Sequence, residues 1–193
     1  MQVNTSAANQ LVDIIDYVPN IKLDIRYATT NNFTGEKIYK SPRAFVRQPL
    51  AMSLSIIQES LNKQGLGLLV FDAYRPYSAT VKFYEIYKDT NYVASPWKGS
   101  RHNRGAAVDV SLINIETGEE IQMPTGFDDF TEAARADYKN LPDNVLKNRE
   151  ILINEMQNHG FKVYKYEWWH FDFIGWEVYD LMDISFEDLK RIK

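Results

Sequence analysis

Apolar residues recur every three or four positions in two long segments of the chain, residues 49–64 and 143–158. The first segment has a proline in its first turn and a glycine just after its end, and the second ends at His159 before another glycine. This spacing, with these boundary residues, predicts two amphipathic helices. A third helix is predicted over 79–88, with Ser78 as its cap. The positions predicted to be buried are Leu50, Leu54, Ile57 and Leu61 in the first helix, Val145, Leu146, Leu152, Ile153 and Met156 in the second, and Val81, Tyr84 and Tyr87 in the third.

Four other segments show strand patterns. Apolar side chains fall on one of two alternating faces in residues 21–27 and 106–113. Residues 66–71 form a short apolar run, and residues 161–173 are also strand-like. A turn over 116–119 predicts a hairpin to a short partner strand over 121–123. Strands mixed with helices and joined by hairpins predict an α+β fold, with a central antiparallel sheet and flanking helices.

The remaining segments carry weaker patterns. Residues 124–141 are expected to be irregular, and the tail over 176–193 partly helical. The polar start of the chain predicts a loosely ordered N-terminal segment over 1–16. A length of 193 residues without internal repeats or linker-like stretches fits a single domain over 1–193.

Composition and charge narrow the function classes. A formal net charge of −4 and a pI near 5.4 argue against nucleic acid or an anionic membrane as partner. The absence of cysteine excludes disulfides and thiolate catalysis, so any zinc must be held by nitrogen and oxygen. No stretch approaches the roughly 18 apolar residues of a membrane span, and residues 1–16 do not resemble a signal peptide. The expected location is therefore cytoplasmic, or periplasmic or secreted if the sequence is a trimmed mature form.

The first candidate for chemistry is the segment 100–109, which contains His102 and Asp109. A turn after His102 would bring it beside Asp109, whose carboxylate interrupts an otherwise apolar strand. A buried carboxylate needs a cation or several hydrogen-bond donors, and a metal ion meets that need. An ion pair of Asp109 with Arg101 or Arg104 meets it equally well, so these residues alone leave both interpretations open.

A second candidate, Glu167 to His170, changes the balance. Two imidazoles and one carboxylate are a common ligand set for catalytic zinc, and a second carboxylate can serve as general base. Trp168 and Trp169 would supply a wall of low dielectric that raises the basicity of Glu167. A regular strand places residues 167 and 170 on opposite faces, so a shared site requires a bulge or turn between them. The alternative is an aromatic core cluster with Glu167 at the surface.

Arg75 and His159 each have a functional and a structural interpretation. Arg75 stands at the end of a predicted strand and is followed by a proline, where a guanidinium could stabilise an oxyanion or form a loop ion pair. His159 at a helix end is interpreted as structural. The chain contains no His-Glu-x-x-His segment, which excludes the thermolysin-type arrangement.

The pattern Ser100-x-His102-x-x-Gly105-x-Ala107-x-Asp109, followed by Glu167-x-x-His170, resembles the zinc D,D-peptidases of the VanX type, the D-alanyl-D-alanine dipeptidases. The resemblance covers about residues 17–173. Further similar segments occur in the same order, over 24–35, 72–76, 117–119 and 127–128.

This resemblance implies roles for eight residues and an α+β fold shared with the Hedgehog signalling domain. By resemblance, one zinc ion is held by His102, Asp109 and His170. Glu167 would be the catalytic base, and Arg75 would stabilise the tetrahedral intermediate. The substrate pocket would be lined by Tyr27, Ser100 and Asp128, the last two near the ammonium end.

The implied activity is hydrolysis of the D-alanyl-D-alanine dipeptide to D-alanine. The segment between Pro76 and Ser100 looks shorter than in the resistance-type dipeptidases, so carboxypeptidase or endopeptidase action on longer peptidoglycan stem peptides is the nearer alternative. A non-catalytic zinc-containing binding module is the more distant one. Glu167 and Arg75 argue against that module, because a structural zinc needs neither.

Overall fold

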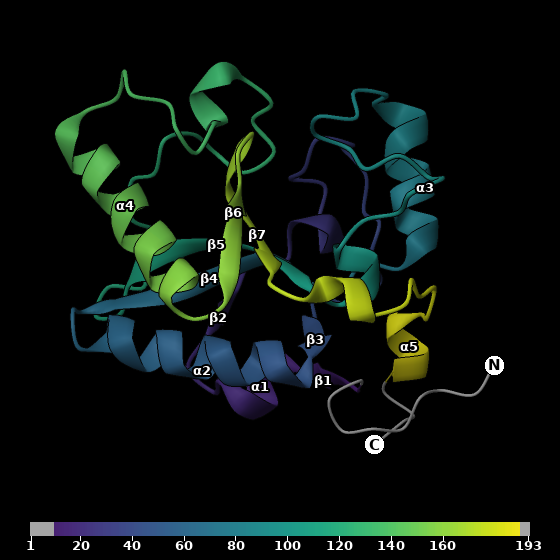
Figure 1. Ribbon diagram of the computed structural model, residues 1–193, viewed down its shortest axis with the longest axis horizontal. Helices are drawn as coiled ribbons and strands as arrows, with labels where there is room; N and C mark the ends of the chain where they lie inside the picture. The colour runs from purple at the N-terminus through teal and green to yellow at the C-terminus, as the bar shows by residue number, and fades with distance from the viewer. Residues whose placement is uncertain (1–9, 190–193) are drawn as a thin grey trace.

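A computed structural model describes residues 10–189 of the protein (Figure 1). Its centre is a five-stranded sheet in the order β2-β4-β5-β7-β6. Four of these strands form antiparallel pairs, and β2 adds to the edge of β4 in parallel. The α+β class is therefore confirmed, with one parallel pair in an otherwise antiparallel sheet. The strands are β2 (Lys22–Leu23), β4 (Leu66–Asp72), β5 (Ala107–Asn114), β6 (Phe161–Tyr164) and β7 (Glu167–Phe173).

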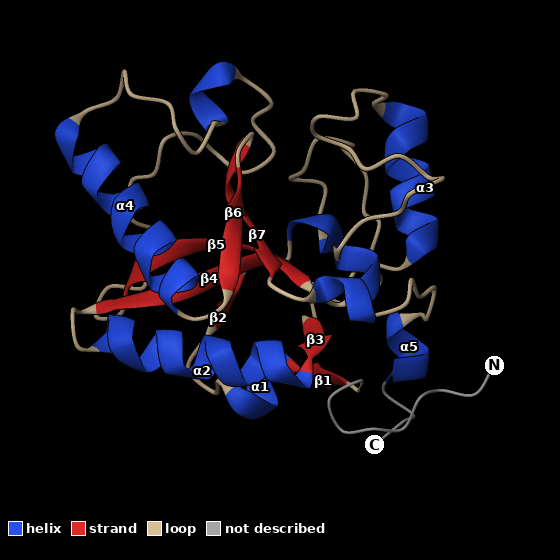
Figure 2. Ribbon diagram, in the orientation of Figure 1, coloured by secondary structure: helices blue, strands red, loops and turns tan. Residues whose placement is uncertain are grey.

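The two long helices cover one face of this sheet (Figure 2). Helix α2 (Gln48–Asn62) packs on β4, α4 (Asp143–Asn158) packs on β6, β7 and β5, and the two helices contact each other. Both begin and end within two residues of the predicted bounds. The apolar stripe predicted for α2 is fully buried, which removes each of its aliphatic side chains from water at a gain of roughly 1.5–3 kcal/mol.

Helix α3 (Tyr77–Ile86) differs from its prediction. It begins directly after Pro76, so Ser78 lies in its first turn and is not the cap; the Ser78 hydroxyl bonds to Asp183 instead. The buried positions are Ala79, Thr80 and Phe83, not the predicted stripe. Phe83 sets this rotation, because its ring packs against two other aromatic rings.

The N-terminal part of the described chain is more ordered than expected. Strand β1 (Leu11–Asp13) pairs with β3 (Phe45–Arg47), and the short helix α1 (Ile14–Tyr17) follows with Asp13 as its cap. The prediction of a loose segment is thus wrong for residues 11–16, because Ile14 is fully buried. The rest of that prediction, over 1–9, lies outside the described residues.

The strand predicted over 21–27 is also shorter than expected. It ends after β2, and the chain turns into the 3-10 turn η2 (Arg26–Ala28). The predicted turn at 116–119 is present, but its partner strand is reduced to a single bridge between Ile113 and Glu120. Three other 3-10 turns and one short helix complete the fold, namely η3 (His102–Arg104), η4 (Glu132–Ala134), η5 (Trp176–Val178) and α5 (Phe186–Leu189).

Between residues 10 and 189, no helix combines the length and the apolar character that crossing a membrane requires.

Candidate metal centre and active site

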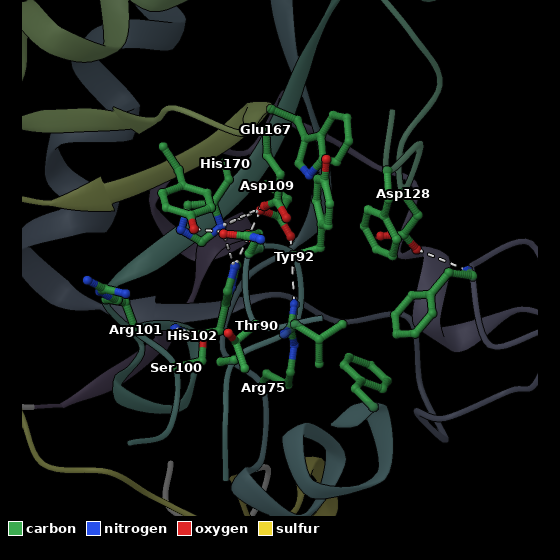
Figure 3. Close-up of a pocket in the computed structure, with 18 of the residues that line it drawn as sticks. Arg75, Thr90, Tyr92, Ser100, Arg101, His102, Asp109, Asp128, Glu167 and His170 are labelled. Atoms are coloured by element: carbon green, nitrogen blue, oxygen red, sulfur yellow. Dashed lines mark hydrogen bonds and ion pairs between the residues drawn. The ribbon is translucent and has the colours of Figure 1, made fainter. Parts of the chain in front are cut away.

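Three ligand-type atoms from distant parts of the sequence meet at one end of the sheet (Figure 3). Asp109 on β5 and His170 on β7 are directly opposite each other in an antiparallel pair, and η3 brings His102 beside them. The His170 Nδ1 lies 3.0 Å from Asp109 Oδ1 and 3.1 Å from His102 Nε2, and the remaining edge, His102 Nε2 to Asp109 Oδ1, is 3.4 Å. These edges are close to the ~3.3–3.4 Å that tetrahedral zinc with bonds of about 2.0–2.1 Å would impose.

The outer nitrogen of each histidine is already engaged. His102 Nδ1 lies 2.7 Å from the Ala73 carbonyl oxygen, which can only accept, so this nitrogen carries the proton. His170 Nε2 lies 2.8 Å from a carboxylate oxygen of Asp172 and is a donor for the same reason. Both inner nitrogens therefore turn lone pairs toward Asp109. Such outer hydrogen bonds are how proteins orient metal-binding histidines.

Two lone pairs and a carboxylate oxygen at these distances require a shared positive charge. Burial alone would raise the pKa of Asp109, but His102 and His170 hold it well below its usual range. Burial would likewise lower the pKa of His170, yet Asp172 and Asp109 raise it well above its ordinary value. The donor set, its spacing and its outer partners all fit a divalent cation.

Glu167 stands beside this cluster because β7 is irregular. Tyr164 pairs with Glu167 while Val163 pairs with Phe171, so the register shifts within the hairpin and brings residues 167 and 170 to the same site. The irregularity required by the sequence argument is confirmed. The Glu167 Oε2 lies 3.7 Å from His170 Nδ1. Burial raises the pKa of Glu167 to about 8; His170 lowers this pKa and Asp109 raises it, each by less than burial does. A carboxylate of this basicity suits proton transfer near neutral pH.

Arg75 follows β4 and is held rigidly. Its Nε and Nη2 donate to Asp72 Oδ2 at 2.9 and 2.8 Å, and Nη2 lies 3.8 Å from Asp109 Oδ2. The guanidinium packs against the rings of Tyr27 and Phe83. The result is a buried cation fixed next to the three candidate metal ligands.

Asp128 and Tyr27 form another part of the same pocket. The Tyr27 hydroxyl donates to Asp128 Oδ1 at 3.0 Å, and the Phe33 amide donates to Oδ2 at 3.2 Å. Burial raises the pKa of Asp128 to about 7. Asp128 has a φ of +62°, the positive value of a strained backbone found in functional loops.

The eight residues predicted for the site all line one pocket. Ser100, however, does not lie with Asp128. Figure 3 shows Ser100 next to Arg101 and His102, and Asp128 on the opposite side of the view. The expectation that Ser100 and Asp128 both lie near the substrate's ammonium group stays a prediction. The Ser100 Oγ accepts a hydrogen bond from the His102 amide at 3.2 Å, which leaves its proton free for another acceptor.

Two acidic residues near the site were not identified from the sequence. Asp72 accepts from Arg75 and from the Tyr39 hydroxyl at 3.0 Å, and Asp172 orients His170. A register shift between Val70 and Asp72 brings Asp72 opposite Asp109. The position of Asp172, two residues after His170 on the same strand, was the signal available. His159 lies apart, with Nδ1 bonded to the Glu155 carbonyl at 2.8 Å.

A His-Asp-His cation site beside a buried glutamate and a buried arginine is the site of a metallopeptidase. The sequence profile of the M15 peptidases, described as D-Ala-D-Ala dipeptidase, matches residues 7–187. The chain belongs to this family.

Individual relatives agree with that assignment. The chain is similar to the D-alanyl-D-alanine dipeptidase of Escherichia coli K12, with 34% identity over 94% of this chain and 93% of the relative. It is 33% identical to the Enterococcus faecium D-alanyl-D-alanine dipeptidase, over 81% of this chain and 87% of that protein. The solved structure of the LdcB LD-carboxypeptidase is a distant likeness, with a TM-score of 0.49 and 20% identity over 90% of this chain and 72% of that chain.

Proposed function

We propose that this protein hydrolyses D-alanyl-D-alanine to two molecules of D-alanine, with one zinc ion held by His102, Asp109 and His170. The observation that carries the proposal is the convergence of these three donors next to Glu167. The relatives named as D-alanyl-D-alanine dipeptidases support the choice of substrate.

Zinc in this position would polarise the scissile carbonyl and lower the pKa of water to about 7. Glu167 accepts a proton from the attacking water and then delivers it to the leaving amine. Its raised pKa supports both steps, since a carboxylate with a pKa near the working pH can take up a proton and release it again. Trp169 lines the pocket and is fully buried, which keeps bulk water away from this transfer.

Arg75 stabilises the negative charge that develops on the carbonyl oxygen. Its bonds to Asp72 and its packing against the rings of Tyr27 and Phe83 hold the guanidinium in place before the reaction, so little reorganisation is needed as charge develops. Asp128, oriented by Tyr27, binds the ammonium group of the substrate. A carboxylate at this position favours a dipeptide with a free amine over a longer chain, in which that nitrogen is an amide.

The test is release of D-alanine from D-Ala-D-Ala by purified protein, before and after chelation and zinc addition, with a stem pentapeptide as the competing substrate. Rapid cleavage of the dipeptide and loss of activity on chelation are expected. Glu167→Gln should keep its zinc, by elemental analysis, and lose about 10²–10⁴-fold in kcat. Preference for the pentapeptide would replace the proposal with a carboxypeptidase or endopeptidase. A zinc-loaded protein inactive on both would indicate a binding module.

A further inference from the structure

A dipeptide bound as proposed has a second charged end. If its ammonium group pairs with Asp128, its C-terminal carboxylate lies on the other side of the scissile bond. A carboxylate placed in a partly enclosed pocket needs a cation or several donors, because burying it unpaired is costly. Among the described residues that line the pocket, two arginines carry a permanent positive charge, Arg75 and Arg101.

Arg75 is not available for this carboxylate. Two of its donors are taken by Asp72, and a second carboxylate, that of Asp109, lies 3.8 Å away. Its side chain is 9% exposed. In the proposed mechanism, its remaining N–H donors stabilise the reacting carbonyl oxygen.

Arg101 has the opposite properties. Its side chain is 43% exposed, and its closest ionic contact is a loose one, with Nε 3.6 Å from Asp172 Oδ2. The Nε–H is shielded from solvent and forms no hydrogen bond with any described residue. The guanidinium carbon lies over the Trp176 ring, 4.8 Å from its centre, so the ring supports the flat face of the side chain. Asp172 is engaged by His170, so it steadies Arg101 without occupying its donors.

The position of Arg101 fits the missing carboxylate. Its backbone is fixed between Ser100 and the candidate ligand His102, and its carbonyl accepts from the Ala106 amide at 3.1 Å. Figure 3 shows Arg101 and Asp128 on opposite sides of the histidine cluster. The pocket therefore runs from a carboxylate at one end to a guanidinium at the other. Ser100, on the same side as Arg101, has its hydroxyl proton free.

We propose that Arg101 binds the free carboxylate on the C-terminal side of the scissile bond and makes the enzyme selective for peptides with an unblocked C-terminus. The inference rests on the proposed dipeptidase function and assigns a specificity residue to it. Together with Asp128, Arg101 would recognise both charged ends of a zwitterionic dipeptide.

The test compares D-Ala-D-Ala with its C-terminal amide on the wild-type protein and on Arg101→Gln. The wild type should prefer the free acid by about 10- to 100-fold in kcat/KM, the range expected for hydrogen bonds to a charged group. Arg101→Gln should lose this preference through a higher KM for the acid, while turnover of the amide changes less than about twofold. Arg101→Lys should restore part of the preference, because it restores the charge without the planar fork.

Lys162→Gln is the matched control. Lys162 is an exposed lysine on β6, and its replacement also removes one positive charge close to Arg101 and Asp172. It should leave the acid-to-amide ratio unchanged. Calorimetric titration of D-Ala-D-Ala into zinc-loaded Glu167→Gln, with and without Arg101→Gln, should show the same loss of affinity without any turnover.

These results distinguish a wrong role for Arg101 from a wrong dipeptidase function. Equal losses of kcat/KM on the acid and the amide in Arg101→Gln would mean that Arg101 acts through Asp172 and His170. A retained preference for the acid would mean that Arg101 does not touch the carboxylate. Either result overturns the role of Arg101 and leaves the dipeptidase function intact. Failure of the wild type to cleave both compounds would overturn the proposed function, and the role of Arg101 with it.

Discussion

At the scale of single residues, the site depends on buried charged side chains that are held by hydrogen-bonded ion pairs. Asp72 is an example, since it is 1% exposed and holds Arg75 through two hydrogen bonds. Asp137 forms a similar two-bond pair with Arg135, but on the surface. The two pairs have the same chemistry in different surroundings, so their removal separates the effect of burial from that of the ion pair itself.

We predict that Asp72→Asn lowers the free energy of unfolding by about 3–5 kcal/mol, because it removes the carboxylate that binds the buried Arg75 guanidinium through two hydrogen bonds. Asp137→Asn should leave stability unchanged, since water screens the exposed pair. Urea unfolding of both variants measures the difference. Equal stability of the two would show that Arg75 does not depend on Asp72. In the active protein, Asp72→Asn should also lower kcat more than it alters KM, since Arg75 acts on charge that develops during the reaction.

Asp128 provides a prediction about pH. Its pKa in the folded protein is raised to about 7 by burial, so the carboxyl is neutral below that pH and charged above it. Only the charged form pairs strongly with the substrate ammonium. The KM for D-Ala-D-Ala should therefore fall as pH rises through about 7, measured from initial rates of D-alanine release. Asp128→Asn should raise KM by about 10-fold or more and remove this pH dependence. A pH profile of KM in Asp128→Asn that matches the wild type would exclude Asp128 as the ammonium partner.

At the scale of elements, two irregularities in the sheet create the site. The shift between Val70 and Asp72 aligns Asp72 with Asp109, and the shift in the β6–β7 hairpin brings Glu167 to His170. The third contribution is η3, which ends at Gly105 with a φ of +66° and turns the chain back toward β5. A side chain at Gly105 would collide with Leu11 of β1. This turn holds His102, so its backbone and the candidate metal centre are coupled.

We predict that Gly105→Ala weakens zinc binding and lowers stability by about 1–3 kcal/mol, because it adds a collision to an unfavourable backbone angle. Gly118→Ala is the control: its φ is +74°, but no atom lies within 4 Å of the added carbon. It should show the backbone penalty alone and bind zinc normally. Zinc titration against a competing chelator, with thermal unfolding, measures both effects. Identical zinc affinity in the two variants would show that the turn does not position His102.

The difference between local patterns and contacts of distant segments explains what the sequence could predict. The helices α2 and α4 were predicted within two residues because their apolar spacing is regular over four turns. The candidate ligands were found because their motifs are local. Asp72 was missed, since its place depends on register and on contacts between segments far apart in the chain. The rotation of α3 was missed for a related reason: Phe83 packs on Tyr27 and Phe33, which no local pattern reveals.

At the scale of the whole molecule, the candidate metal centre brings together three elements, one of which lies far from the other two in the sequence. His102 and His170 are 68 residues apart, and the ligand set combines η3, β5 and β7. In the unfolded chain these donors are dispersed, so a metal ion binds the folded state preferentially. Binding energy at the site is then added to the stability of the entire fold.

Zinc should therefore raise the melting temperature, by a stabilisation of about 4 kcal/mol when free zinc exceeds its dissociation constant by about 1,000-fold. Chelation should reverse the shift. His170→Ala removes one of the three donors and should abolish most of the shift. His159→Ala removes a histidine whose ring is bonded to a helix carbonyl, and it should keep the shift. Differential scanning calorimetry of the three proteins, with zinc and with chelator, gives the comparison. If zinc stabilised His170→Ala as strongly as the wild type, the ion would bind elsewhere, and the convergence of the three side chains would need an explanation without a metal.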